Sequence, residues 1–151
     1  MNVIRANFTL KDDMVEKADI YLGSSLDNIL TADGAECWTM PPKKYCKAAV
    51  QNVEKVLNNH DRRLPSKCRA PLNPGYRPEL NISPELIADG VQRYQELIGM
   101  LRWAIEIGRI DILLEVLLML NHLALPRTRY LEHLYHVFVF LKEKPKIKSG
   151  F

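Results

Sequence analysis

Few side chains in this 151-residue sequence have a spacing that suits catalysis. Asp12 and Asp13 form a carboxylate pair, and paired carboxylates hold the Mg²⁺ that phosphoryl transfer needs. Lys11 precedes the pair, and no apolar strand flanks it directly. Acidic pairs in such a setting are commonly solvated surface charge. We therefore assign this pair to a surface loop and predict no catalytic residue in the chain.

Histidines supply the next candidates for chemistry. His133 and His136 are three residues apart, and His122 lies in the preceding apolar segment. Histidines at that spacing on a helix can chelate Zn²⁺, but a stable site needs three or four ligands. No other ligand stands at a fixed spacing from them. We predict no metal site and no cofactor in this chain.

The three cysteines are Cys37, Cys46 and Cys68, an odd number without a C-x-x-C motif. This pattern favours free thiols in a reducing compartment over a disulfide framework. Cys46 lacks any local signature of a nucleophile, so we interpret it as a small buried hydrophobe. No signal peptide is visible, and the apolar run 116–120 is far shorter than the roughly 20 residues that span a bilayer. We expect an intracellular protein, cytoplasmic or nuclear, with no membrane contact.

The net charge of +3 hides a strong unevenness along the chain. Residues 1–41 hold three basic and seven acidic side chains, net −4, and residues 42–80 hold nine basic and three acidic, net +6. Residues 81–126 are net −3 and residues 127–151 net +4. Concentrated positive charge attracts a phosphate backbone through counterion release and steering. A solvated helix face followed by a loop explains the same blocks equally well.

If the basic blocks bind nucleic acid, side chains within and near them are the candidate contacts. Trp103 beside Arg102 could stack on a base and contact a phosphate, although a second packing surface would also explain the tryptophan. The predicted nucleic-acid contacts are Lys43, Lys44, Lys47, Arg62, Arg63, Lys67, Arg69, Arg102, Trp103, Arg109 and Arg127.

The N-terminal part must position the first basic block. The runs 19–30 and 36–40 predict two strands joined by a turn at Asp33–Gly34, with Trp38 and Tyr21 able to stack across them. Pro41–Pro42 is typical of a helix start. The expected apolar face of that helix carries Tyr45, Ala49, Val53, Val56 and Leu57. The polar, proline-rich stretch 60–88 reads as a linker without long elements.

Three apolar-periodic segments between Tyr94 and Lys144 predict a helical unit. Gly108 suits the end of the first helix, whose own Gly99 we expect to allow close helix approach. The segment 112–125 is apolar almost all round, so we predict that it forms the buried central helix and ends at Pro126. The expected core residues are Tyr94, Leu97, Ile98, Leu101 and Ile105 in the first segment and Leu131, Leu134, Tyr135, Phe138 and Leu141 in the third.

Four motifs in order carry a family resemblance over nearly the whole chain. They are Tyr21-Leu22-Gly23, then Tyr45-Cys46-Lys47, then the proline-rich run 71–80, then Tyr94 with Leu97-Ile98-Gly99, Arg109 and Asp111. This series resembles the C-terminal part of the reverse transcriptase domain in copia-type retrotransposon polyproteins.

The resemblance implies a fold and assigns each part of the chain to a part of a polymerase. Residues 1–59 correspond to the end of a polymerase palm, 60–88 to a linker and 89–151 to a three-helix thumb-like bundle. The expected class is therefore α+β, mostly α. In this family the Mg²⁺-binding aspartates lie in a hairpin upstream of the matched segment. We therefore expect contact with an RNA or DNA template-primer and no polymerisation by this chain alone.

Other functions fit the same residues. The chain could be a non-catalytic protein-interaction module, with a protein partner or self-association through the hairpin and helices. It could also be a degenerate remnant of a retroelement with no selected activity.

Overall fold

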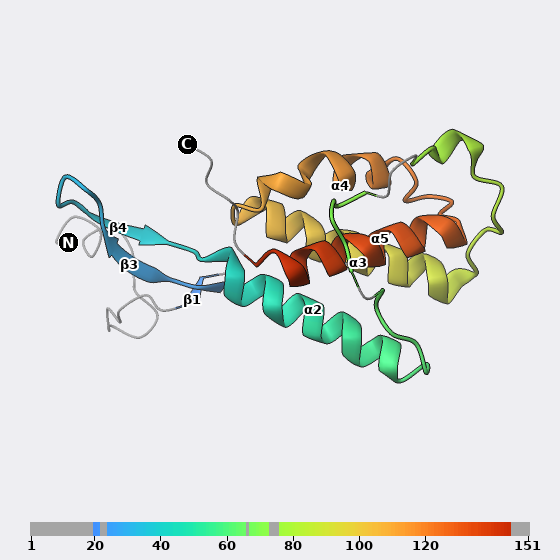
Figure 1. Cartoon of the computed structure of the whole chain (residues 1–151), viewed down its shortest axis with the longest axis horizontal. Coiled ribbons are helices and arrows are strands. Elements are labelled where there is room, and N and C mark those ends of the chain that lie inside the picture. Colours follow the sequence, from blue (N-terminus) through green and yellow to red (C-terminus); the bar gives the residue numbers. More distant parts are fainter. Residues whose placement is uncertain (1–19, 22–23, 66, 73–75, 146–151) are drawn as a thin grey trace, which may run out of the picture. The chain divides into compact units, whose positions relative to one another are not determined.

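The computed structural model describes residues 20–21, 24–65, 67–72 and 76–145 (Figure 1). The fold is α+β and mostly α, as predicted, with an antiparallel hairpin followed by four helices. The chain forms two compact units that divide between Thr39 and Met40. The carboxylate pair at Asp12 and Asp13 lies outside the described residues.

The first unit contains short antiparallel strands. β1 (Ile20–Tyr21) pairs with β2 (Ser24–Ser25), and β3 (Asp27–Leu30) pairs with β4 (Glu36–Thr39). The prediction of one strand over residues 19–30 is wrong, because two separate strands, β1 and β2, pair antiparallel inside that range. The register sets Trp38 opposite Asn28, and Tyr21 pairs with Ser24.

The turn between β3 and β4 confirms the signal at Asp33–Gly34. The N–H of Thr31 donates to the carbonyl of Ala35 at 2.9 Å, and the N–H of Gly34 donates to the carbonyl of Thr31 at 2.9 Å. Gly34 has a φ of 82°, which glycine adopts without steric cost. The Thr31 hydroxyl donates to the carboxylate of Asp33, and this bond lowers the pKa of Asp33.

The second unit begins with α2 (Pro42–Asn58), which starts at the predicted proline pair. Its buried face is turned slightly from the predicted one, so that Tyr45 and Val56 are only half-buried. The Tyr45 hydroxyl donates to the carbonyl of Met100 at 3.1 Å, which ties α2 to the next helix. The buried residues of α2 are Cys46, Ala49, Val50, Val53 and Leu57.

Three further helices complete this unit (Figure 1). They are α3 (Ala88–Glu106), α4 (Leu113–Leu120) and α5 (Thr128–Glu143), with the short 3₁₀ turn η2 (Ile110–Ile112) before α4. Gly108 follows α3 with a φ of 114°, as expected for a glycine at a helix end. None of the helices in the described part of the chain is long and apolar enough to cross a membrane.

The central helix is α5, and the prediction that the segment 112–125 fills that place is wrong. α4 ends at Leu120 and buries only Val116 and Met119. α5 packs on α2, α3 and α4, so nearly its whole circumference is covered. Its buried residues are Tyr130, Leu131, Leu134, Tyr135, Val137, Phe138, Val139, Phe140 and Leu141.

The stretch 60–88 does not divide the helices into two groups. α2 packs directly on α3 and α5, so it belongs with the later helices rather than with the hairpin. The described residues of the stretch include one 3₁₀ turn, η1 (Pro78–Leu80). Its end is tied to the start of α5, because the N–H of Thr128 donates to the carbonyl of Pro84 at 3.0 Å.

Candidate nucleic-acid interface

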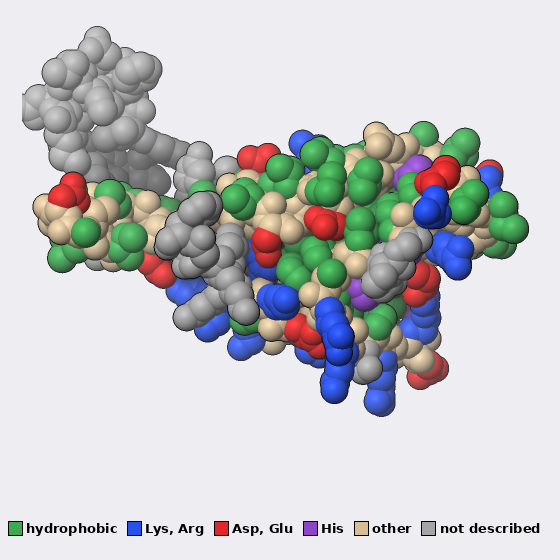
Figure 2. All heavy atoms as spheres, turned by 45° about the horizontal axis from the view of Figure 1, so that its top comes forward, with side chains coloured by type: hydrophobic (Ala, Val, Ile, Leu, Met, Phe, Trp, Pro, Cys, Tyr) green, Lys and Arg blue, Asp and Glu red, His purple; other side chains and the backbone are tan. Residues whose placement is uncertain are grey.

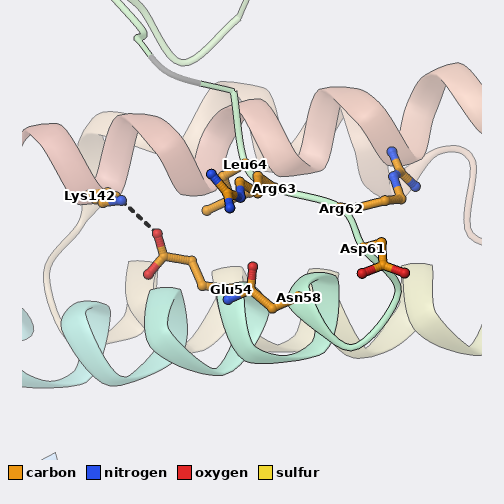
Figure 3. Close-up of a pocket in the computed structure, with 7 residues that line it drawn as sticks. All are labelled: Glu54, Asn58, Asp61, Arg62, Arg63, Leu64 and Lys142. Atoms are coloured by element: carbon orange, nitrogen blue, oxygen red, sulfur yellow. Dashed lines mark hydrogen bonds and ion pairs between the residues drawn. The ribbon is translucent and has the colours of Figure 1, made fainter.

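α2 and α5 lie side by side (Figure 1). Two pockets adjoin along them, and Figure 3 shows the first of these. The first has a volume of about 620 Å³ and the second about 320 Å³. Both are lined by Glu54 and Lys142, so they meet at that pair, and we call them together the α2–α5 groove. The first is also lined by Asn58, Asp61, Arg62, Arg63 and Leu64, and the second by Lys43, Lys47, Val50, Gln51, Leu141 and Pro145.

The helical repeat of α2 explains why its polar residues line the groove. Residues three or four apart share a helix face. With Ala49, Val53 and Leu57 directed into the core, the adjoining face carries Lys43, Lys47, Gln51, Glu54 and Asn58. Lys142 comes from the last turn of α5, where a cation also suits the negative end of the helix dipole.

Two ion pairs join the two sides of the groove. Lys142 Nζ lies 2.6 Å from Glu54 Oε1, and Arg62 Nη2 lies 2.5 Å from Glu132 Oε1 on α5. The hydrogen bond to Glu132 raises the pKa of Arg62, whose guanidinium lies 5.6 Å from the ring centroid of Tyr135. All four charged side chains keep substantial exposure, so each pair contributes no more than about 1 kcal/mol.

The groove keeps an excess of positive charge. It is lined by five cations, Lys43, Lys47, Arg62, Arg63 and Lys142, against the two carboxylates of Glu54 and Asp61. Within the part of the chain that the structure describes, Lys43, Lys47 and Arg63 make no ion pair. Figure 3 shows the guanidinium of Arg63 between the ribbons of α2 and α5. Lys and Arg side chains gather along one edge of the helical unit in Figure 2.

Four of the predicted contacts therefore meet in one place: Lys43, Lys47, Arg62 and Arg63. Lys142 was missed, because a lysine near a helix end is equally well explained by the helix dipole. Only the packing of α5 on α2 places it beside the first basic block.

The remaining predicted contacts are spread over other surfaces. Lys44 is exposed on α2 outside the groove lining, and Arg102 is exposed and Trp103 half-buried on α3. Arg127 donates to the carbonyl of Ser83 at 2.7 Å and forms an ion pair with Glu85 at 3.2 Å. These contacts connect the end of the stretch 60–88 to the start of α5. Lys67 and Arg69 are exposed in the stretch 60–88, beyond the last residue of that stretch that lines the groove, Leu64.

Arg109 is not a surface contact, and its prediction as one is wrong. Its side chain is fully buried, and Nε and Nη2 each donate to the carboxylate of Asp111 at 2.8 Å. Burial alone would lower the pKa of Arg109, but the hydrogen bonds and charge of Asp111 outweigh it and raise that pKa. Burial also raises the pKa of the neighbouring Cys46 thiol, which Arg109 partly offsets. This pair holds the corner between α3 and α4.

The three histidines His122, His133 and His136 have separate partners, and His122 lies in the turn after α4. His122 stacks on Tyr130 with ring centroids 4.0 Å apart, and His133 meets the Tyr76 ring edge-on at 4.6 Å. His136 Nε2 lies 3.1 Å from the sulfur of Cys68. Among the described residues, no group of three or more His, Cys, Asp or Glu side chains gathers to hold a metal ion.

No family model, no curated protein and no solved structure matches this chain. The functional assignment therefore depends on the ordered motifs of the sequence and on the geometry of the α2–α5 groove.

Proposed function

We propose that this chain binds nucleic acid as the non-catalytic palm end and thumb of a copia-type reverse transcriptase. The observation that carries the proposal is the α2–α5 groove, where five cations face two carboxylates. The ordered motifs supply the family, and a mostly helical fold after a hairpin is what that resemblance implies.

The groove suits the sugar-phosphate backbone better than the bases. None of its described lining residues is aromatic, so it offers no platform on which bases stack. Lysine and arginine contacts to phosphates fix position and carry little sequence information. The expected ligand is a template-primer duplex held without regard to its sequence, in the cytoplasm or the nucleus.

The role proposed for the chain is binding and not chemistry. The resemblance assigns the Mg²⁺ of the parent polymerase to aspartates upstream of the matched segment. The groove residues would hold the duplex while those aspartates act on it. A primer-extension assay with this chain alone should yield no product, and extension of the primer would contradict this division of labour.

A titration with a fluorescent RNA–DNA hybrid tests the binding directly. Among the described residues, Lys43, Lys47 and Arg63 are the groove cations without an ion pair, and three phosphate contacts give a log–log salt slope near −2.7. Affinity should therefore fall about 40-fold between 50 and 200 mM salt. No binding at 50 mM salt, or binding that salt does not weaken, would contradict the proposal.

A second candidate function, a protein-interaction module, is favoured by one specific surface. Ile110, Leu113, Leu114 and Leu117 are exposed and recur at helical spacing along η2 and α4. Figure 2 shows hydrophobic side chains grouped on this side of the helical unit. Contiguous exposed apolar surface commonly marks an interface. Sedimentation that gives a clean monomer at all concentrations, with no partner recovered, would argue against this module.

A further inference from the structure

A third pocket lies where the end of α2, the start of α3 and α5 meet, and among the described residues it shares only Arg62 with the α2–α5 groove. Its volume is about 700 Å³, within the range of small-molecule sites. Leu57, Leu131 and Tyr135 contribute side chains that are almost fully buried. Ile87 stands at its edge with 77% of its surface exposed, so apolar surface continues to the pocket mouth.

Arg93 gives this apolar pocket an unusual polar group. The arginine lines the pocket, and its side chain is only 18% exposed. Its Nη1 lies 3.5 Å from Glu96 Oε2, a long contact, whereas Nε and Nη2 are buried with no hydrogen-bond partner among the described residues. A buried charged group without partners is costly, so these two nitrogens need a further acceptor, which a water, an ion or a ligand could supply.

The two unpaired nitrogens define the ligand chemistry. Nε–H and Nη2–H project from the same edge of a guanidinium, and together they bind both oxygens of a carboxylate or phosphate. Arg109 shows this geometry in the same chain, because its Nε and Nη2 each contact Asp111 at 2.8 Å. In Arg93 the corresponding edge has no acid.

We propose that this pocket binds a small amphipathic anion, with its acid group on the Nε–Nη2 edge of Arg93 and its apolar body over Leu57, Leu131 and Tyr135. Both nitrogens are buried, so binding requires the guanidinium to turn its Nε–Nη2 edge into the pocket, and the long contact to Glu96 is lost when it turns. Arg62 and His60 also line the pocket and add positive charge, whereas Asp89 and Glu96 oppose it. The bound acid must therefore displace the Arg93–Glu96 contact.

Hexanoate is a suitable probe, and hexanol is its uncharged control. Titration followed by the ¹⁵N–¹H signal of Arg93 Nε should show a saturable shift with hexanoate, and about tenfold weaker binding of hexanol. No saturable shift with hexanoate, or equal binding of hexanol, would overturn the proposal.

Two variants locate the contact. Arg93→Gln should weaken hexanoate binding, followed by the backbone amide signals of α3, about tenfold. Arg102→Gln, an exposed arginine of the same helix outside the pocket, should leave it unchanged. Glu96→Gln keeps Arg93 and removes its competing acid, so it should tighten binding. Unchanged binding in Arg93→Gln, or weaker binding in Glu96→Gln, would count against the site.

Discussion

Arg109 and Asp111 illustrate how one buried side chain can support a corner between helices. A guanidinium with no exposed surface gives up its hydration, and two hydrogen bonds to a single carboxylate offset part of that loss, while Nη1 has no hydrogen-bond partner among the described residues. The sequence showed the spacing of these two residues, but an arginine two residues before an aspartate is equally compatible with a surface site. The burial of Arg109 could not be predicted from the sequence, because it depends on α2, whose Cys46 lies beside Arg109 at the corner between α3 and α4.

Removal of one member of this pair should destabilise the fold strongly. Asp111→Asn leaves the Arg109 charge buried without its partner, so we expect a loss of about 3 kcal/mol in the free energy of unfolding. The double variant Arg109→Met with Asp111→Leu removes both charges and should recover most of that loss. Urea unfolding at pH 7 measures both. A double variant as unstable as the single one would contradict this account of the corner.

His133 should make stability depend on pH. Burial lowers the pKa of His133 below its ordinary 6.5, and nearby Arg129 and His136 lower it further, against a smaller opposite effect of Glu132. The folded state therefore binds its proton less readily than the unfolded state. The stability is fully present above pH 6.5 and falls as the pH drops below that value.

The His133→Gln variant isolates this effect from the carboxylates. Urea midpoints measured between pH 7.5 and pH 5 should fall more steeply in the wild-type chain than in the variant. Equal slopes for the two proteins would show that His133 takes up its proton equally well in both states.

At the scale of elements, Gly99 lies in the interior of α3, and no neighbouring contact among the described residues requires a glycine there. A Cβ at this position would meet nothing within 4 Å, so the predicted close approach of another helix is wrong. Glycine in a helix interior costs up to about 1 kcal/mol relative to alanine. Gly99→Ala should therefore raise the free energy of unfolding by about 0.5–1 kcal/mol, as measured by urea unfolding. A loss of stability would reveal a contact that needs the bare backbone.

The helices themselves follow from local patterns, but their places in the bundle do not. Pro41–Pro42 and Gly108 mark helix ends by backbone chemistry that acts within a few residues, so these positions were predictable. The segment 112–125 has apolar side chains on all faces, and such a pattern is compatible with a central helix. Its partners cover only one side, so Leu114 and Leu117 remain exposed.

The ion pair between α2 and α5 should restrain the groove. Glu54 holds Lys142 at 2.6 Å, so this lysine is not free for a phosphate. Glu54→Gln releases it, and one further phosphate contact should tighten binding of an RNA–DNA hybrid about eightfold at 0.1 M salt. Asn58→Ala, a change beside the same pair that keeps every charge, is the control. Weaker binding in Glu54→Gln would contradict a competitive role for the carboxylate.

At the scale of the whole molecule, folding joins charges that are far apart in the sequence. Lys43, Lys47 and Arg63 belong to the basic block 42–80, and Lys142 belongs to the block 127–151. The two blocks were visible in the sequence, whereas their meeting required the packing of α5 on α2. The acidic stretch 81–126 contributes α3 and α4, which do not line the groove.

The salt dependence of hybrid binding in matched variants tests the nucleic-acid interface most directly. The double variant Lys47→Gln with Arg63→Gln removes two groove cations that make no ion pair. Lys55→Gln with Arg129→Gln removes the same charge from exposed positions outside the groove that make no ion pair among the described residues. The groove variant should reduce the log–log salt slope by about 1.8, and the control should leave it unchanged. Equal losses in the two variants, or no loss in the groove variant, would contradict the assignment of the α2–α5 groove as the nucleic-acid interface.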